Sequence, residues 1–206
     1  MRFIHTADWH LGRLTHGIHL TRDQEAILEE LKIVMKDFRP DALLICGDIY
    51  DRAVPPPDAV RLLDDFLSYA SLELEVPVLI ISGNHDSSHR LEFASRVLAK
   101  RNLHLFGSLN SCLEPVTLFD AFGPVHFFSI PYSEPSEIKI HLDSADIEDS
   151  DSAYEALLQR LQPRCDNDER RVLLAHAFVG NGTTTESERP LLIGGIDKVD
   201  PDRFQS

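Results

Sequence analysis

LLICGDIYD, residues 43–51, passes from four consecutive apolar side chains into two carboxylates within a few positions. An apolar run of this kind is typical of a strand that is buried on both faces of a parallel sheet. Asp48 and Asp51 follow this run, although an unpaired buried charge is costly. The same arrangement recurs in VLIISGNHD (78–86) and, more weakly, in RFIHTADWH (2–10). The sequence therefore predicts parallel strands whose carboxyl ends bear polar side chains.

The segment that follows the first strand predicts an amphipathic helix over residues 21–38. Thr21 and Gln24 have the spacing of a capping box, in which two side chains bond the backbone at the start of a helix. One apolar stripe with helical spacing is then available to face the sheet: Ile27, Leu31, Val34 and Phe38.

Along the chain, predicted strands and helices first alternate, and several strands then follow one another. A helix follows the prolines at 55–57, and another spans residues 87–99, with a serine available to cap it. The segments HLFG, CLEPVTLFD and VHFFSIPY are strand-like, and DAFGP is typical of a hairpin turn. A helix at 153–162 and a buried strand at 170–177 follow. This order predicts an α/β protein with mixed sheets.

Composition is ordinary for a globular protein of 206 residues, with 43% hydrophobic and 26% charged residues. No apolar run approaches the ~20 residues that span a bilayer, so no membrane association is expected. The cysteines at 46, 112 and 165 have neither metal-site nor disulfide spacing, which favours a reducing, cytoplasmic setting.

The net charge of −14 argues against a broad basic surface for nucleic acid. Much of the excess lies in residues 134–155, where eight acids accompany one lysine. We interpret this stretch as a solvated loop and helix edge that would repel DNA.

Polar side chains follow each predicted strand, and in open α/β sheets functional groups gather beyond the carboxyl ends of the strands. Asp8 and His10 are two residues apart, so an extended backbone would point them the same way. The candidate site residues are Asp8, His10, Asp48, Asp51, Asn84, His85, Asp86 and His176. Adjacent strands lie ~4.8 Å apart, so these groups are expected to converge in one pocket.

A pocket of carboxylates, an amide and imidazoles repels itself unless a cation occupies it. Mixed oxygen and nitrogen ligands without thiolate favour manganese, iron or zinc over calcium or magnesium. One carboxylate, such as that of Asp48, can bridge two metal ions ~3.5–4 Å apart. The sequence therefore predicts a site for two divalent metals.

The ordered motifs D-x-H, G-D-x-x-D and G-N-H-D, with a later strand-end histidine, resemble those of the calcineurin-like metallophosphoesterase superfamily. HTADWHLGR (5–13), GDIYDRAVPPPDAV (47–60) and GNHDSSHRLEFA (83–94) are similar to the SbcD-type family of double-strand-break-repair nucleases. The resemblance covers essentially the whole chain and implies a metallophosphoesterase-type α/β/β/α sandwich.

The resemblance also implies roles for the site residues. The implied metal ligands are Asp8 and His10 for one ion, Asp48 bridging both ions, and Asn84 and His176 for the other. His85 would face the scissile phosphate, where it would stabilise charge or protonate the leaving oxygen. Asp51 and Asp86 would orient the metal ligands.

The implied function is a metal-dependent DNA nuclease, with exonuclease and endonuclease activity on phosphodiesters and with manganese as the favoured metal. Its partners would be DNA and a coiled-coil ATPase of the SbcC type, in a complex for DNA repair, recombination and replication. A homodimer would form through helices near 57–72 and 89–100. The residues that suggest this surface are Val60, Leu63, Leu67, Leu91, Ala94 and Leu98.

One departure from the family concerns its fifth motif, Gly-His-x-His, which does not occur after His176. Residues 1–206 are therefore expected to be an incomplete metallophosphoesterase domain, truncated at the C-terminus. The expected missing parts are the fifth motif, the capping domain and the segment that binds the ATPase.

Two alternatives to a nuclease stay open. A two-metal phosphatase acting on phosphomonoesters is favoured slightly by the negative charge and opposed by the DWHLG and PPP stretches. A catalytically weak metal-binding module is the other, because a site that lacks the fifth motif would hold its metals less tightly.

Overall fold

The apolar runs form one parallel sheet in the computed structural model, which describes residues 1–112, 114–162, 168–180 and 198–204. Its strands lie in the order β1-β4-β5-β6. They are β1 (Phe3–Thr6), β4 (Ala42–Cys46), β5 (Val78–Ile81) and β6 (Leu103–Phe106). Every residue of β4 and β5 is buried, as expected for central strands that are covered on both faces.

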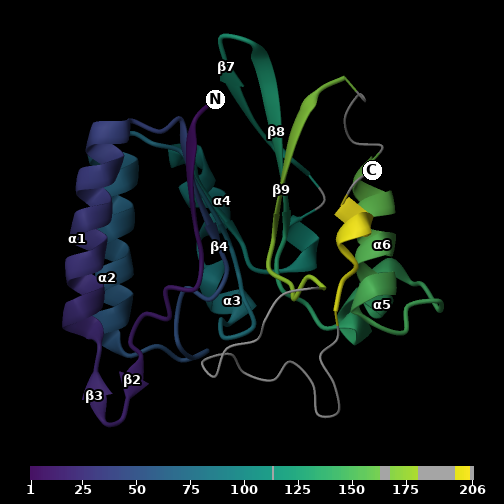
Figure 1. Ribbon diagram of the computed structural model, residues 1–206, viewed down its shortest axis with the longest axis horizontal. Helices are drawn as coiled ribbons and strands as arrows, with labels where there is room; N and C mark the ends of the chain where they lie inside the picture. Colours follow the sequence, from purple (N-terminus) through teal and green to yellow (C-terminus); the bar gives the residue numbers. More distant parts are fainter. Residues whose placement is uncertain (113, 163–167, 181–197, 205–206) are drawn as a thin grey trace.

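Helices α1 (Thr21–Phe38) and α2 (Pro57–Ser68) cover the outer face of this sheet (Figure 1). Helix α2 begins with Pro57 at its first position, as predicted, and continues as a π-helical turn, η1 (Tyr69–Glu73). The side chains of Leu43, Ile45 and Ile80 face these helices and pack in the same cluster as Leu28 and Phe66.

The apolar face of α1 differs from the predicted stripe. Leu28 and Met35 are 4% and 1% exposed, whereas Ile27 and Val34 are 62% and 51% exposed. The sequence has apolar residues on two overlapping stripes that are offset by one position, and helical periodicity cannot choose between them. Packing on the sheet selects the stripe that contains Leu28, Leu31 and Met35.

The predicted capping box at the start of α1 is also wrong. Leu20 occupies the N-cap position, and no side chain caps the helix there. Thr21 Oγ1 instead donates to Asp58 Oδ2 on α2 at 3.2 Å. Gln24 bonds the loop that follows β1.

The helix predicted over 87–99 is broken into α3 (Ser88–Leu91), α4 (Ser95–Leu98) and the 3₁₀ turn η2 (Ala99–Arg101). Ala94 adopts a left-handed conformation between α3 and α4, with φ +58°. Just before it, the Glu92 carboxylate accepts hydrogen bonds from the backbone N–H groups of Gly107 and Ser108. The helix is therefore interrupted where Glu92 bonds the backbone that follows β6.

Most of the residues suggested for a dimer surface belong to the core under α1 and α2: Leu63, Leu67, Leu91 and Leu98. The apolar side chains exposed in the two suggested segments include Val60 on α2, Val97 on α4 and Phe93 in the turn between α3 and α4. The homodimer stays a prediction, with a smaller apolar surface than the sequence suggested.

A second sheet has the order β7-β8-β9, with β7 antiparallel and β9 parallel to β8. The strands are β7 (Val116–Asp120), β8 (Gly123–Ile130) and β9 (Arg170–Ala175). Helices α5 (Pro135–Leu142) and α6 (Ser150–Leu161) cover its outer face. The acid-rich stretch therefore contributes α5, which the sequence interpretation missed, and the first half of α6.

The two sheets pack face to face through a shared apolar cluster. Ala42, Leu44, Leu79 and Ile81 of the first sheet meet Val125, Phe127 and Leu174 of the second. The layers in Figure 1 run from α1 and α2 through both sheets to α5 and α6, which confirms the predicted α/β/β/α sandwich.

Smaller elements complete the described chain. A hairpin of β2 (Leu14–Thr15) and β3 (Ile18–His19) precedes α1, and the 3₁₀ turns are η3 (Leu109–Ser111) and η5 (Pro201–Phe204). Within the described ranges, no helix combines the length and the apolar composition that crossing a bilayer requires.

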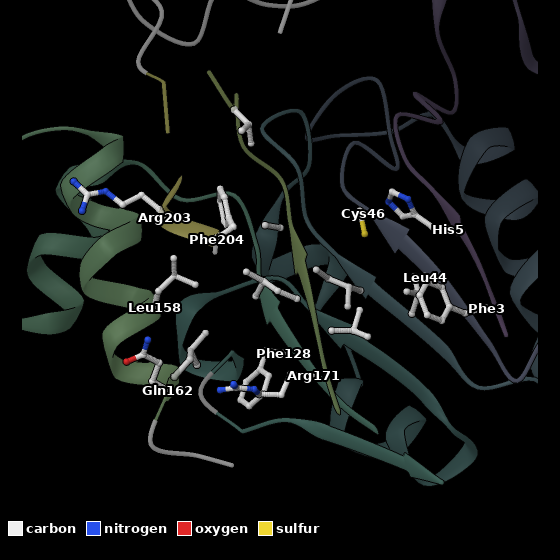
Figure 2. Close-up of a pocket in the computed structure, with 16 residues that line it drawn as sticks. Phe3, His5, Leu44, Cys46, Phe128, Leu158, Gln162, Arg171, Arg203 and Phe204 are labelled. Atoms are coloured by element: carbon white, nitrogen blue, oxygen red, sulfur yellow. The ribbon is translucent and has the colours of Figure 1, made fainter. Parts of the chain in front are cut away.

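A cavity of about 730 Å³ lies around strand β9 and extends from β1 and β4 of the first sheet to α6 and η5 (Figure 2). Its lining is mainly apolar, with Phe3 and Leu44 on one side and Phe128 and Leu158 on the other. The polar residues of the candidate site do not line it. They lie at the carboxyl ends of the strands.

Candidate metal centre

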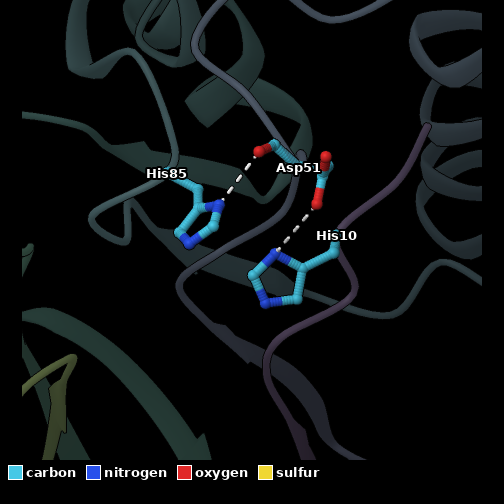
Figure 3. Close-up of side chains that lie close together, drawn as sticks. All are labelled: His10, Asp51 and His85. Atoms are coloured by element: carbon cyan, nitrogen blue, oxygen red, sulfur yellow. Dashed lines mark hydrogen bonds and ion pairs between the residues drawn. The ribbon is translucent and has the colours of Figure 1, made fainter. Parts of the chain in front are cut away.

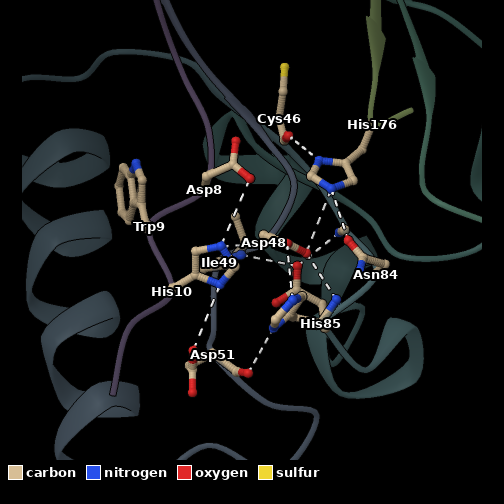
Figure 4. A network of polar contacts seen from close by, with 12 residues as sticks. Asp8, Trp9, His10, Cys46, Asp48, Ile49, Asp51, Asn84, His85 and His176 are labelled. Carbon is tan, nitrogen blue, oxygen red and sulfur yellow. Dashed lines mark hydrogen bonds and ion pairs between the residues drawn. The ribbon is translucent and has the colours of Figure 1, made fainter. Parts of the chain in front are cut away.

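The loops that follow β1, β4, β5 and β9 bring the predicted residues together at one end of the sandwich (Figure 4). The structure contains two groups of three possible metal ligands, and within each group the donor atoms lie within 4.8 Å of one another. One group is Asp8, Asp48 and His176, and the other is His10, Asp51 and His85. Asn84 lies beside His176, and Asp86 lies behind the loops. The predicted convergence is therefore observed.

Asp48 is the centre of this arrangement and is 3% exposed. Its Oδ2 lies 3.6 Å from His10 Nε2 and 3.8 Å from His85 Nε2. Its Oδ1 lies 3.7 Å from His176 Nε2 and accepts a hydrogen bond from the His85 backbone N–H at 2.9 Å. The two carboxylate oxygens thus face different imidazoles, as a bridging ligand requires.

The His176 ring is oriented by the strand it faces. Its Nδ1 lies 2.8 Å from the Cys46 carbonyl oxygen, and a carbonyl can only accept, so Nδ1 is the protonated nitrogen. In the neutral ring, Nε2 then has a lone pair, which points at Asn84 Oδ1 at 3.2 Å and at Asp48 Oδ1. Three acceptors that converge in this way repel one another unless a cation or a proton lies between them.

His85 repeats this orientation. Its Nδ1 lies 2.9 Å from the Asp51 carbonyl oxygen, so Nδ1–H is the donor and Nε2 faces Asp48. The backbone of Asp51, and not its carboxylate, therefore orients the His85 ring. A backbone carbonyl behind an imidazole is a common means of fixing the tautomer of a metal ligand or a proton donor.

His10 lies between Asp8 and Asp51 (Figure 3 shows the Asp51 side). Its Nε2 is 3.9 Å from Asp8 Oδ1, and its Nδ1 is 4.0 Å from Asp51 Oδ1. Among the described residues this buried Nδ1 has no hydrogen-bond partner. Burial lowers the pKa of His10, although the Asp48 carboxylate opposes the shift, and the neutral ring is the form that binds metal.

The donor set fits divalent metal ions on these observations. It combines carboxylate, imidazole and carboxamide groups, and several lone pairs converge around one buried carboxylate. The grouping of His10 with Asp51 and His85 differs from the partition that the family resemblance implies. His85 Nδ1 is engaged by a backbone carbonyl, however, so only its Nε2 faces the centre.

Two glycines allow the strand ends to approach this closely. A Cβ at Gly47 would lie 2.2 Å from His176 Nδ1, and one at Gly83 would lie 2.1 Å from Asp48 Oδ1. Neither position has room for a side chain. The packing of the site therefore explains why glycine precedes Asp48 and why glycine precedes Asn84.

The expectation that an extended backbone aligns Asp8 and His10 is wrong. Strand β1 ends at Thr6, and Asp8 and His10 have φ values of +58° and +45°. Asp48 is also left-handed, with φ +51°. For residues other than glycine this conformation costs roughly 1–3 kcal/mol, so surrounding contacts must maintain it. Two backbone bonds, Asp8 N–H to Gly47 O and His10 N–H to Asp48 O, contribute.

Asp86 supports the loops and not the imidazoles. Its carboxylate accepts hydrogen bonds from the backbone N–H groups of Gly83 at 2.9 Å, Tyr50 at 2.9 Å and Ile49 at 3.1 Å. Burial raises the pKa of Asp86, while these hydrogen bonds oppose the shift. Asp86 therefore ties the loop after β4 to the loop after β5, and the prediction that it orients metal ligands stays a prediction.

We expect Asp86→Ala to lower the free energy of unfolding by about 3 kcal/mol or more, because it leaves buried N–H groups without an acceptor at ~1–3 kcal/mol each. Urea unfolding followed by circular dichroism measures this. Asp86→Asn keeps one acceptor oxygen and should lie between alanine and wild type. Equal stability of the alanine variant and the wild type would refute this role.

The sequence interpretation missed Gln24 as a neighbour of the site. The carboxamide of Gln24 contacts the backbone of residues 9–12, which follow Asp8. Its spacing from Thr21 suggested a cap, and no local pattern distinguishes a capping glutamine from one that reaches a loop more than ten residues away.

An α/β/β/α sandwich with carboxylate, imidazole and carboxamide donors gathered at the strand ends defines the metallophosphoesterase class. A sequence model of the calcineurin-like phosphoesterase family matches residues 1–197, and the chain belongs to this family. The predicted family is thereby confirmed.

Two curated relatives are similar along the whole chain, and both are named as the SbcD component of the SbcCD nuclease. The relative from Staphylococcus epidermidis is 35% identical over 205 residues, which cover 100% of this chain and 54% of that protein. The relative from Staphylococcus saprophyticus is 36% identical over 204 residues, which cover 99% and 53%. The chain thus spans about half the length of these relatives.

Proposed function

We propose that residues 1–206 form a metallophosphoesterase domain of a metal-dependent DNA nuclease. The observation that carries this proposal is the buried Asp48 carboxylate, which imidazole Nε2 atoms face from several sides. The two SbcD relatives, which are named as parts of a nuclease, support phosphodiesters of DNA as the substrate class.

The residues would divide the work as follows. Asp8 and His10 would hold one divalent ion, Asn84 and His176 would hold the other, and Asp48 would be a ligand that they share. Bound ions of this kind lower the pKa of water and polarise a phosphoryl oxygen. Manganese fits the oxygen and nitrogen donors best, with iron or zinc as alternatives.

His85 would act on the substrate. The Asp51 carbonyl holds its Nδ1 proton, so that Nε2 is directed into the centre. From there it can stabilise charge on the scissile phosphate or protonate the leaving oxygen. The Asp51 carboxylate, 4.0 Å from His10 Nδ1, would restrict the His10 ring.

The wider role is part of the same proposal. A coiled-coil ATPase of the SbcC type would be the partner, with DNA as the substrate, in a cytoplasmic repair and recombination complex. The name SbcCD that the relatives bear supports a partner subunit, and the ATPase character and the repair role rest on the family resemblance. A homodimer through α2 and the segment around α3 and α4 is proposed beside it.

Substrate preference tests the proposal. With Mn²⁺, the purified protein is expected to cleave a labelled DNA duplex and bis-p-nitrophenyl phosphate faster than p-nitrophenyl phosphate, and EDTA should stop all three reactions. In a protein that also contains the segment that binds the ATPase, adding this partner with ATP should increase duplex cleavage. Preferential hydrolysis of the phosphomonoester would favour the phosphatase alternative, to which the net charge of −14 is better suited.

Sedimentation tests the homodimer. At tens of micromolar protein, we expect a dimer boundary that Phe93→Glu converts to monomer, because Phe93 is 80% exposed on this segment. Phe122→Glu, at an equally exposed phenylalanine of the β7–β8 hairpin, is the matched control. A wild-type protein that sediments only as a monomer would contradict the dimer.

A further inference from the structure

The Gln24 side chain forms hydrogen bonds with three backbone groups of the loop after β1. Its Oε1 accepts from the Gly12 N–H at 3.0 Å. Its Nε2 donates to the His10 carbonyl at 2.7 Å and to the Trp9 carbonyl at 3.1 Å. One residue of α1 thus spans the turn in which His10 lies.

This loop needs such support because its conformation is unfavourable. Asp8 and His10 are left-handed, and Gly12 has φ +82°. The N–H groups of Asp8, His10 and Leu11 donate to the backbone after β4, which holds the donor side of the loop. Gln24 bonds the Trp9 and His10 carbonyls and the Gly12 N–H, and the His10 carbonyl also accepts from the Arg13 N–H at 3.1 Å.

A carboxamide suits this position for a chemical reason. The loop presents one donor and two acceptors, and glutamine offers an acceptor oxygen and a donor nitrogen on the same group. A glutamate of the same shape would keep the bond to Gly12 but would set a carboxylate oxygen against the carbonyls of Trp9 and His10. A methionine of similar length would satisfy none of the three groups.

We propose that Gln24 is a positioning residue, which holds the loop so that Asp8 and His10 present their side chains to one metal ion. This inference rests on the proposed two-metal centre and adds a residue that touches neither metal nor substrate. Its effect should be confined to the ion that Asp8 and His10 bind, because Asn84 and His176 lie on loops outside the stretch that Gln24 bonds.

Manganese binding tests this role without any measurement of activity. Isothermal titration calorimetry and Mn²⁺ electron paramagnetic resonance would give the number of ions bound and their affinities. Gln24→Glu and Gln24→Met are each expected to lower the binding affinity for one Mn²⁺ ion by about 10- to 100-fold, the usual effect of removing a group that orients metal ligands. The affinity for the second ion should stay unchanged.

Matched controls separate positioning from stability. Leu28→Ala removes a buried side chain from the same helix and should lower the melting temperature while leaving both Mn²⁺ affinities intact. Thr21→Ala removes a side-chain hydrogen bond one turn away and should change neither quantity appreciably. The glutamate variant places a charge inside the protein and could prevent folding. In that case the neutral methionine variant alone provides the test of the positioning role.

Each outcome bears on a different claim. Wild-type affinity for both ions in a folded Gln24→Met variant would overturn the positioning role, and so would an equal loss of affinity in Leu28→Ala. If the wild-type protein itself bound no Mn²⁺, the two-metal centre would be wrong, independently of Gln24.

Discussion

Asp48→Ala is expected to abolish metal-dependent cleavage of DNA without unfolding the protein. Asp48 faces three imidazoles with its two oxygens, so both proposed ions lose a shared ligand when it is removed. The loss should exceed the ~10²–10³-fold that removal of a single electrostatic stabiliser causes. Initial rates on a labelled duplex with Mn²⁺ measure it.

Asp48→Asn separates charge from structure. The asparagine can keep the hydrogen bond from the His85 backbone N–H, which Asp48 Oδ1 accepts at 2.9 Å. We expect this variant to be as inactive as Asp48→Ala, while its metal-free form is at least as stable as wild type, because a buried charge has been removed. Nuclease activity near the wild-type level in either folded variant would be incompatible with a bridging role.

His85→Ala should separate metal binding from chemistry. If His85 acts on the phosphate, turnover should fall by ~10²–10⁴-fold, the usual contribution of a general acid, while Mn²⁺ occupancy is kept. Calorimetric titration and initial rates on the same preparation measure both quantities. The Asp51 carbonyl loses its partner in this variant, so circular dichroism should confirm the fold.

The alternative for His85 is a metal ligand, because its donor atoms group with those of His10 and Asp51 within 4.8 Å. In that case His85→Ala would lose an ion together with its activity. His126→Ala is a suitable control, since His126 is a partly buried histidine on β8, away from the site, where Nδ1 bonds Thr117. This control should leave both occupancy and turnover unchanged.

Much of the fold was predictable because burial on both faces leaves a simple pattern in a sequence. The apolar runs before Asp48 and Asn84 are β4 and β5, and Pro57 begins α2 as expected. The face of α1 was not predictable, because apolar residues occupy two stripes that satisfy the same period. Helix α5 was missed because it is short and rich in polar residues, and Ile138 alone of its residues is buried, so it has no clear apolar periodicity.

The residue types of the candidate site were determined by the sequence itself, since each polar group directly follows a strand whose end must lie at one edge of the sheet. Tertiary structure decided the rest. The tautomers of His85 and His176 depend on carbonyls 34 and 130 positions away in the chain. Gln24 reaches a loop that local periodicity does not connect to it, and Asp86 bonds N–H groups 36 and 37 positions away. Such partners meet only when the chain has folded, because hydrogen bonds depend on the position of single atoms, whereas the sequence pattern reports only which faces are buried.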